Sequence, residues 1–412
     1  MGTKKLRNVM FGLGLAGMLG AQCAYAAQTV DFWYHVDNPE NTKIVDELVK
    51  DFEGKNPDIK IKAQNIPWNS YFDKLYTSII GNQTPDVALV RLSLQPQLVE
   101  MDAIETIDDR IAKWSGKDDL ADNILEINKA ADGKQYYLPI HYVVLYLYYR
   151  ADLFDKAGLK PPTTCEEFLD AAKKLTVPAA QNNGIDQYGF GMRGGRGGQD
   201  NWGPFVLPKV DFTKGKGSFT TADAIAANAW YVDLFRVHKV TPPSAPNDGF
   251  NEIISTFKSG RTAMIFHHVG SSKTIVEALG DKVSAVPVPK ACGGGQWTYF
   301  GDESTALFKK SKVKDAAWKW MTFLSEGENN VKFTTATGQV TVTKSGAAKA
   351  QFPERFVKAT TESLPFASSL PAVPETADFL TSAWPVNMQR ALIGEITPEQ
   401  MMKELDAHFF GK

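Results

Sequence analysis

The 412-residue sequence predicts an α/β fold built from two domains. β-Prone segments and amphipathic helical segments alternate from residue 29 onward, which is typical of a largely parallel sheet with right-handed crossovers. The chain is also longer than a single hydrophobic core usually supports, so we expect two domains. Ligands of open α/β sheets bind beyond the carboxyl ends of the strands, so we expect the site on the loops that follow them.

The first α/β unit follows directly after the N-terminal segment. Residues 29–33 are β-prone, and residues 38–53 carry apolar side chains at helical spacing. A strand over 59–63, a helix over 71–80 and a buried strand over 87–90 complete the predicted unit. The loops after the first and third of these strands are therefore expected near the site.

A second α/β unit begins after Pro139. Residues 142–150 are continuously apolar and aromatic, as expected of a buried strand. Thr164 and Glu167 form a capping-box pattern, which predicts a helix that begins here and ends at Leu175. Further along the chain, we expect helices over 222–237 and 315–327 and a short strand over 262–266.

Residues 191–218 are rich in glycine and include the run Gly194-Gly195-Arg196-Gly197-Gly198. We expect this segment to be a long surface loop. No Lys-Ser or Lys-Thr pair follows the glycines at P-loop spacing, so the segment is not predicted to bind phosphate as NTPases do.

Residues 1–26 are predicted to form a cleaved signal peptide. Three cationic residues precede an apolar stretch over 9–19, and Ala24-Tyr25-Ala26 matches the rule for cleavage after small residues. We therefore expect export to the periplasm, with the mature chain beginning at Ala27.

Two other fates of the N-terminus are less well supported by the sequence. The apolar stretch is too short to span a bilayer as an uncleaved anchor. A lipoprotein signal at Cys23 would need a small residue before the cysteine, where Gln22 stands.

The mature chain is weakly acidic. Cleavage after residue 26 removes three cationic side chains and no acidic ones, so the formal charge falls by three, from −2 to −5. This charge argues against a nucleic-acid partner, which would require a basic face. No later apolar run approaches the length of a membrane span.

Two cysteines, Cys165 and Cys292, remain after cleavage. They could pair in an oxidising compartment, but the sequence does not show whether they are close in space. We expect two separate small apolar residues, and a disulfide remains the alternative.

A series of short motifs runs in order along the mature chain. The motifs include Phe32-Trp33-Tyr34-His35, Asn56-Pro57-Asp58-Ile59, Thr84-Pro85-Asp86-Val87, Leu147-Tyr148-Tyr149-Arg150, Phe257-Lys258-Ser259-Gly260-Arg261 and Thr337-Gly338-Gln339. In this order, the chain resembles the extracellular solute-binding proteins of the maltose-binding type, which serve carbohydrate ABC importers. Arg150, Cys165 and Gln339 depart from the usual family pattern, which weakens assignment to a subfamily.

The resemblance implies two α/β lobes joined by hinge strands, with a ligand cleft between them that closes around the ligand. Hinge closure of this kind is well known for periplasmic binding proteins. The expected lobes are residues 27–140 with about 285–340, and about 141–284 with 341–412. The implied partners are a sugar and the membrane permease with its ATPase, and we expect a monomer.

Sugar recognition needs aromatic faces that pack on pyranose rings and polar side chains that hydrogen-bond the hydroxyls. We expect such residues near the cleft, although Trp33 and Trp68 fit core packing equally well. The earlier candidates are Trp33, His35, Asp37, Trp68, Arg91, Ser93, His141 and Tyr142. The later candidates are Asp200, Asn201, Trp202, His267, His268, Gly301, Asp302, Glu303 and Arg390.

Two other ligand classes remain open within the same family. Glycerol 3-phosphate or a phosphodiester would need a phosphate site, which Arg91, Arg193 or Arg196 could form. A polyamine would need carboxylates such as Asp37 and Asp86.

Metal binding and catalysis are not expected. Four of the six histidines are candidates, but they lack His-x-x-x-His or another tight ligand spacing, so we predict neither a metal nor a cofactor. A glycosidase would use paired carboxylates such as Asp302 and Glu303, but adjacent strand residues point to opposite faces. No Ser–His–Asp or Cys–His signature is present, so we expect a receptor and not an enzyme.

Overall fold

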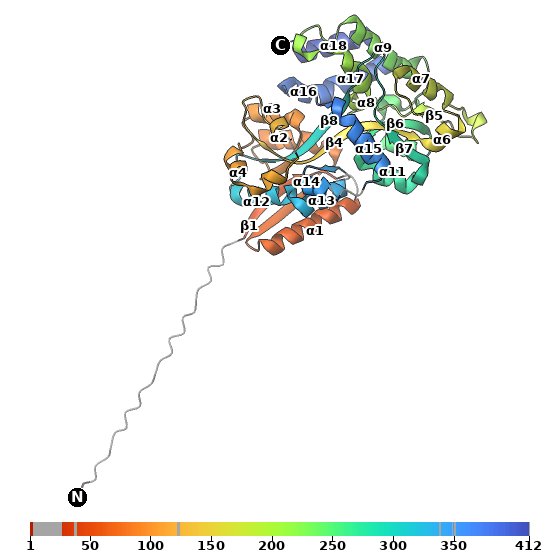
Figure 1. Ribbon diagram of the computed structural model, residues 1–412. Helices are drawn as coiled ribbons and strands as arrows, with labels where there is room; N and C mark the ends of the chain where they lie inside the picture. Colours follow the sequence, from red (N-terminus) through yellow and green to blue (C-terminus); the bar gives the residue numbers. More distant parts are fainter. Residues whose placement is uncertain are drawn as a thin grey trace.

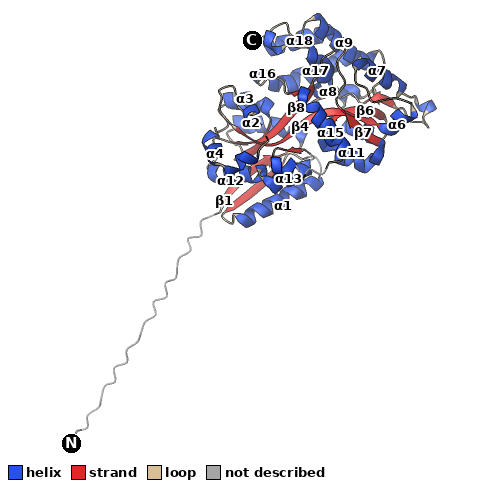
Figure 2. Ribbon diagram, viewed as in Figure 1, coloured by secondary structure: helices blue, strands red, loops and turns tan. Residues whose placement is uncertain are grey.

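The computed structural model describes residues 1–2, 27–36, 39–121, 124–337, 339–347, 349 and 352–411. Nearly all of the predicted signal peptide therefore lies outside the described residues. The described part forms two lobes, each with strands at its centre and helices around them (Figures 1 and 2). Among the described helices, none is both long enough and apolar enough to cross a membrane.

The first lobe is built on three parallel strands from the N-terminal part of the chain. β1 (Gln28–Tyr34) lies between β2 (Ile59–Asn65) and β3 (Val87–Val90). α1 (Pro39–Lys55) and α2 (Trp68–Ile80) connect them. The predicted strands and helices of this unit are confirmed, with ends that differ by at most three residues.

Two long strands complete this sheet and join it to the second lobe. β8 (Thr298–Leu307) pairs antiparallel with β3, and the first part of β4 (Tyr137–Arg150) pairs antiparallel with β8. The second part of β4 pairs with β6 (Thr262–His268) and β7 (Val283–Val286). The expectation of a largely parallel sheet therefore holds for β1 to β3 and fails for the strands that cross between the lobes.

The start of β4 differs from the sequence prediction, which placed it at Tyr142. The strand begins at Tyr137, and its register shifts between Pro139 and His141. Proline has no N–H to donate to the ladder, so strands accommodate it at such irregularities. The carbonyl of Pro139 accepts a hydrogen bond of 3.1 Å from the hydroxyl of Ser325.

The second lobe places helices around β5 (Tyr188–Phe190), β6 and β7. α7 (Cys165–Lys174) begins at the predicted cap, where Thr164 Oγ1 accepts a hydrogen bond from the backbone N–H of Glu167. The predicted helices at 222–237 and 315–327 are confirmed as α9 (Ala222–Arg236) and α12 (Lys314–Ser325).

The remaining helices and strands complete the two lobes. The further helices are α3 (Gln95–Glu100), α4 (Asp108–Lys113), α5 (Ile124–Ile127), α6 (Ala151–Lys156), α8 (Gln199–Val206), α10 (Phe250–Lys258), α11 (Ser272–Leu279), α13 (Gly327–Thr337), α14 (Lys344–Ala347), α15 (Glu354–Ser363), α16 (Pro374–Asp378), α17 (Trp384–Ile393) and α18 (Pro398–Phe410). β9 (Val340–Thr341) pairs with β4, and β10 (Ala367–Ser368) pairs with β8.

Each lobe has a large cluster of buried apolar side chains. The first cluster is drawn mainly from residues 30–140 and 306–342. The second is drawn from residues 147–288 and 370–409. The clusters do not follow the expected lobe boundaries throughout, because Val342 and Ala377 pack in the first cluster and Val288 packs in the second. The lobe boundaries therefore stay a prediction.

The first part of the glycine-rich segment, residues 191–206, is not a surface loop, which corrects the sequence prediction, whereas several residues between 211 and 216 are exposed. The first part contains α8, and most of its residues up to Val206 are buried. A Cβ atom at Gly203 would lie 2.3 Å from the ring of Trp297, and one at Gly198 would lie 1.9 Å from the carbonyl oxygen of Arg193. The glycines are therefore needed for close packing, not for exposed turns.

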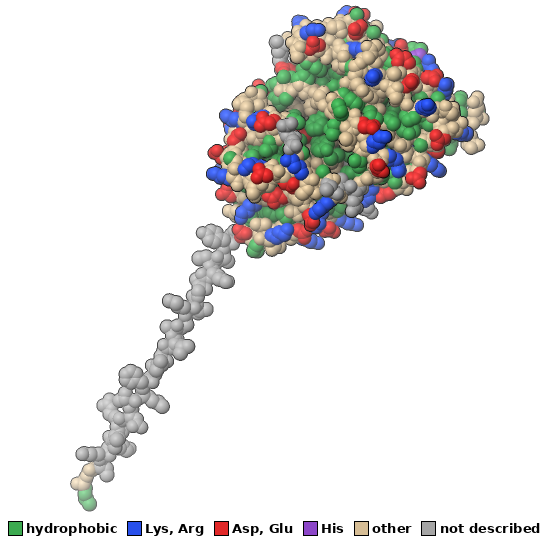
Figure 3. Space-filling model, viewed as in Figure 1, with side chains coloured by type: hydrophobic (Ala, Val, Ile, Leu, Met, Phe, Trp, Pro, Cys, Tyr) green, Lys and Arg blue, Asp and Glu red, His purple; other side chains and the backbone are tan. Residues whose placement is uncertain are grey.

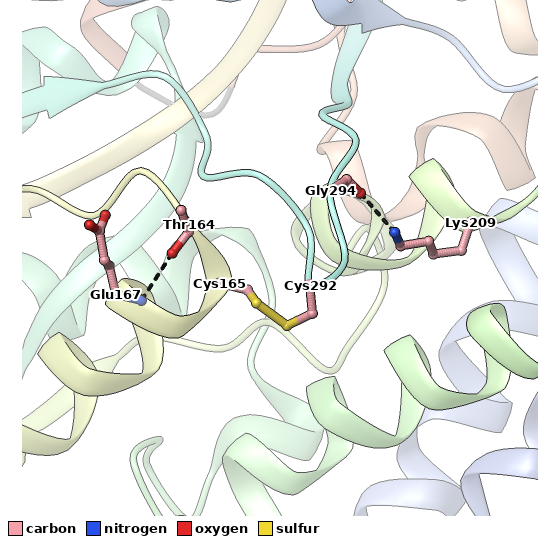
Figure 4. Close-up of a disulfide and its surroundings, with 6 residues drawn as sticks. All are labelled: Thr164, Cys165, Glu167, Lys209, Cys292 and Gly294. Atoms are coloured by element: carbon pink, nitrogen blue, oxygen red, sulfur yellow. Dashed lines mark hydrogen bonds between the residues drawn. A yellow bond between two sulfur atoms is a disulfide. The ribbon is translucent and has the colours of Figure 1, made fainter.

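Cys165 and Cys292 form a disulfide, so the expectation of two separate residues is wrong (Figure 4). Cys165 opens α7, and Cys292 lies in the connection between β7 and β8, with their Cα atoms 5.3 Å apart. The neighbouring backbone brings them together, because the N–H of Lys290 donates a 2.9 Å hydrogen bond to the carbonyl of Thr163. No local sequence pattern signals this pairing, since 127 positions separate the two cysteines.

Loss of this disulfide is expected to destabilise the second lobe. Replacing both Cys165 and Cys292 with Ser should lower the free energy of unfolding by about 2–4 kcal/mol, because the unfolded chain loses a long covalent loop. Urea unfolding with and without a reductant measures the change. The reductant should destabilise the wild-type protein and leave the double variant unchanged; equal stability of both proteins would contradict the disulfide.

Candidate ligand-binding cleft

A cavity of about 740 Å³ lies between the lobes and is lined by residues of both. His35 follows the end of β1, Arg91 and Ser93 follow β3, and His267 and His268 end β6. The ends of strands therefore supply much of the wall, as expected for an α/β sheet. On the face drawn in Figure 3, hydrophobic side chains gather toward the middle and charged ones toward the margins.

The structure brings many of the predicted site residues together around this cavity. The ten that line it are His35, Trp68, Arg91, Ser93, His141, Asp200, Asn201, His267, His268 and Glu303. Their contact with a ligand remains a proposal, which the geometry of each wall supports.

The first-lobe wall carries the indole ring of Trp68, the first residue of α2. The guanidinium carbon of Arg91 lies 4.0 Å from the centroid of this ring, which is a cation–π contact. The ring of His35 packs edge-on against the same indole, with centroids 4.8 Å apart. Arg91 and His35 therefore fix the orientation of the Trp68 ring, which is called the aromatic plate of the cavity below.

A buried carboxylate, that of Glu303 on β8, gathers three side chains at the base of the first-lobe wall. Its Oε1 lies 3.1 Å from His35 Nε2 and 3.4 Å from the Arg91 guanidinium, and its Oε2 lies 3.1 Å from His141 Nε2. Burial alone would raise the pKa of Glu303, but His35 and His141 outweigh it and hold this pKa well below its usual value. Glu303 is therefore an ionised anchor.

Asp302, the neighbour of Glu303, faces away from the cavity, which corrects its assignment to the site. Its Oδ1 accepts a 3.1 Å hydrogen bond from the N–H of Leu92, and its Oδ2 accepts one of 2.8 Å from the hydroxyl of Ser304. Burial raises the pKa of Asp302 to about 6. The alternation of side chains along β8 thus separates Asp302 from Glu303, as the sequence argument against a carboxylate pair requires.

The second-lobe wall presents buried polar atoms that lack partners among the described residues. Asn201 Nδ2 donates a 3.1 Å hydrogen bond to the carbonyl of Phe266, which leaves Asn201 Oδ1 as an unpaired acceptor. His267 Nδ1 accepts from the N–H of His268, so the proton of the neutral ring lies on Nε2, which also has no partner. Burial keeps the ring neutral by lowering the pKa of His267 well below its usual value.

The start of α8 adds a third unpaired group to the same wall. Gln199 Nε2 donates a 3.2 Å hydrogen bond to Asp200 Oδ1, which leaves Gln199 Oε1 without a partner in the described part of the chain. Burial raises the pKa of Asp200 to about 6, although Arg193 and Arg91 act in the opposite direction.

Several residues that line the cavity were not among the predicted site residues. They are Arg193, Arg196, Phe250, Ser271, Tyr299, Gln339 and Thr381, among others. Arg193 and Arg196 stand out in the sequence only as cations within the glycine run, where they were considered for a phosphate. Phe250 and Tyr299 carry no signal, because each occurs in an ordinary amphipathic or apolar segment.

Trp202 and Trp33 are core residues, which corrects two predicted aromatic contacts. Trp202 is fully buried, and its Nε1 donates a 2.8 Å hydrogen bond to Asn228 Oδ1. Trp33 packs in the first-lobe core, and its carbonyl accepts a hydrogen bond from the hydroxyl of Tyr71. In both cases, burial of a large apolar ring within a regular element outweighs the position near a loop.

Three further candidates are not among the residues that line the cavity. Tyr142 stacks on Phe300 across the β4–β8 ladder, Gly301 is buried beside the ring of Tyr299, and Arg390 pairs with Glu404 on the surface. Asp37 lies outside the described residues.

Residues 37–331 match the family model of the bacterial extracellular solute-binding proteins. The chain belongs to this family. The two-lobed fold and the cleft between the lobes agree with the fold that the sequence motifs imply.

Known relatives cover most of this solute-binding protein. A protein of Brucella abortus (strain 2308), named only as a binding protein, is 27% identical over 379 residues and covers 88% of each chain. The mannitol-binding protein of Pseudomonas aeruginosa is 25% identical over 292 residues, covering 67% of this chain and 64% of its own.

A solved structure shows the same fold over nearly the whole chain. The ABC transporter solute-binding protein of Thermotoga lettingae, bound with α-D-tagatose, superposes with a TM-score of 0.83 at 23% identity. The match covers 93% of this chain and 99% of that one. The predicted two-lobed periplasmic-binding-protein fold is thereby confirmed.

The Glu303 anchor predicts a pH-dependent loss of stability. Replacing Glu303 with Gln should lower the free energy of unfolding at pH 7 by about 2–4 kcal/mol, because Arg91 then lacks its carboxylate. The folded pKa lies below the unfolded value of 4.5, so Glu303 stabilises fully above about pH 4.5 and less as the pH falls further. Urea unfolding at pH 7 and pH 3.5 measures both effects.

The control for this experiment is Glu362→Gln, which changes an exposed residue near Lys358 on the same helix. This variant should match the wild-type protein at both pH values. A Glu303→Gln deficit that is the same at pH 7 and pH 3.5 would contradict the ionised anchor.

Proposed function

We propose that this protein is the substrate-binding component of a carbohydrate ABC importer and captures a sugar or sugar alcohol in the interlobe cleft. The observation that carries this proposal is the pairing of an aromatic plate on one wall with unpaired donors and acceptors on the other. Trp68 supplies the plate, and Asn201, His267 and Gln199 supply the polar atoms.

Hydroxyl groups fit the second-lobe wall because each hydroxyl both donates and accepts hydrogen bonds. Asn201 Oδ1 and Gln199 Oε1 are acceptors, and His267 Nε2 carries a proton to donate. A buried polar group without a partner costs about 1–3 kcal/mol, so a polyhydroxylated ligand that satisfies all three would bind favourably. An apolar ligand would leave these costs in place.

The relatives support the same ligand class. One is named for mannitol, and a structural neighbour holds α-D-tagatose. Family membership supports export through a signal peptide to the periplasm and delivery to a membrane permease with its ATPase. We propose a monomeric receptor without catalytic activity.

Closure of the cleft is part of this proposal. Arg196 of the second lobe lies 3.6 Å from Asp73 on α2, so an ion pair already bridges the lobes beside the cavity. A ligand shifts such a hinge equilibrium only by binding the closed state more tightly than the open one. Contacts with both Trp68 and Asn201 would provide that difference, because the two residues lie on opposite walls.

Calorimetry with a panel of monosaccharides, oligosaccharides and sugar alcohols tests the ligand class. We expect at least one member to bind near micromolar affinity, roughly −8 kcal/mol. X-ray scattering of the same sample should show a smaller radius of gyration with that ligand. An amino acid and a polyamine are tested beside this panel. Binding of either one, with no binding of any carbohydrate, would contradict the proposal.

The aromatic plate can be tested separately once a ligand responds. Replacing Trp68 with Ala should raise the Kd about tenfold or more, because the sugar loses both ring stacking and buried apolar contact. Trp318→Ala is the matched control, since Trp318 packs edge-on against Trp114 away from the cleft. Equal Kd values for Trp68→Ala and the wild-type protein would refute the role of the plate.

A further inference from the structure

Arg193 is a buried cation in the cleft wall. The contacts described for the first-lobe wall do not pair its charge. Its side chain lines the cavity, and only 8% of the residue is exposed. Its Nε is buried without a partner, and within the described residues no hydrogen bond or ion pair of its guanidinium is present. Buried charges in proteins are normally paired, because an unpaired one loses its hydration without compensation.

The other arginines of the cavity have protein partners. Arg91 lies beside Glu303, and Arg196 lies beside Asp73. Asp200 is the remaining carboxylate on the cavity wall, and its nearest oxygen lies too far from Arg193 to form an ion pair within 4.0 Å. Burial also raises the pKa of Asp200 to about 6, so this carboxylate compensates Arg193 only in part.

Cations outnumber anions among the charged side chains that line the cavity, although Asp73 pairs with Arg196 and Glu252 attracts Arg193 from outside the lining. The charged residues that line the cavity are Arg91, Arg193, Arg196 and Lys258 on the positive side and Asp200 and Glu303 on the negative side. The same cations act on His268. Burial, and after it the charge of Arg91, lower the pKa of His268 to about 3. An anion that enters the cleft is therefore attracted by these cations.

The glycine run holds the guanidinium of Arg193 in place. Gly197 has a φ of +84°, and a Cβ there would lie 1.9 Å from Arg193 Nη2, so only glycine lets the backbone pass so closely. On another side, Arg193 and His267 both face the ring of Phe250, at 5.8 Å and 4.4 Å from its centroid. The unpaired Nε2 proton of His267 and the guanidinium thus lie around one aromatic ring.

From this geometry, we propose that the ligand is a sugar or sugar alcohol with an acid group, and that Arg193 and the His267 Nε2 proton bind its oxygens. The acid group is a carboxylate or a phosphate, since both present the oxygens that a guanidinium binds. The inference rests on the proposed function and adds a charge to its ligand. A neutral ligand would leave Arg193 with only the partial compensation of Asp200 and Glu252 when closure excludes water from the cleft.

Calorimetry with matched pairs on the wild-type protein tests this inference without any variant. The pairs are D-galacturonate with D-galactose, D-gluconate with D-glucitol, and sn-glycerol 3-phosphate with glycerol. We expect the acid of at least one pair to bind about 100-fold more tightly than its neutral partner. The carboxylate and phosphate pairs distinguish the two sources of the charge.

Variants then assign the effect to Arg193. Arg193→Gln should weaken binding of the preferred acid about 100-fold and change the Kd of the neutral partner less than about threefold. Arg193→Lys, which keeps the charge but lacks the fork of the guanidinium, should retain part of the preference. Arg390→Gln, a surface arginine paired with Glu404, is the control and should match the wild-type protein. If Arg193→Gln does not fold, the matched pairs and Arg193→Lys still decide.

The outcomes separate this inference from the proposed function. A neutral partner that binds as tightly as its acid overturns the inference and leaves the sugar receptor intact. If none of the six compounds binds, mass spectrometry of the ligand released from natively purified protein decides. An acid with several hydroxyls supports the inference, a neutral sugar overturns it, and a non-carbohydrate solute overturns the proposed function as well.

Discussion

Strand β4 carries backbone hydrogen bonds of both lobes, and the geometry of the cleft depends on this sharing. Residues of its first half pair with β8, and residues from Leu145 onward pair with β6 and β7. The exchange of partners occurs where the lobes meet, so side chains near it face the cavity. His141 is directly opposite Glu303 in this ladder, which is why the charged anchor forms on the first-lobe side, next to the junction.

The two walls of the cleft differ in how their polar groups are satisfied. On the first-lobe side, the carboxylate of Glu303 contacts His35, His141 and Arg91, so its charge is compensated by protein atoms. On the second-lobe side, Asn201 and other buried groups lack partners in the described residues. The carboxylate of the first wall is therefore compensated by protein cations and imidazoles, although among the described residues His141 Nδ1 lacks a partner there as well. Under the proposed function, a ligand would gain its differential affinity for the closed state from contacts with both walls.

The sequence predicted those features that depend on local patterns. Strands β1, β3 and β6 and helices α1, α7 and α9 were placed within a few residues, because apolar periodicity and the cap at Thr164 are local signals. The burial of 191–206, the disulfide and the core position of Trp202 depend on neighbours far along the chain, such as Trp297, Cys292 and Asn228. Five of the ten cavity residues found, among them His35, Arg91 and His267, follow or end strands, which mark an α/β site. Arg193 was considered only for a phosphate, because its burial in the cavity wall depends on contacts far along the chain.

The unpaired groups of the second wall remain available because their support is rigid. Trp297 packs against Gly203 on α8, and the loop that carries this tryptophan is tied to α7 through Cys292. Asn201 is fixed from behind by the carbonyl of Phe266. These contacts hold α8 in place through packing, a disulfide and a hydrogen bond. Under the proposed function, such a wall would meet a ligand without first reorganising, so binding energy that would otherwise order the site would be available for affinity.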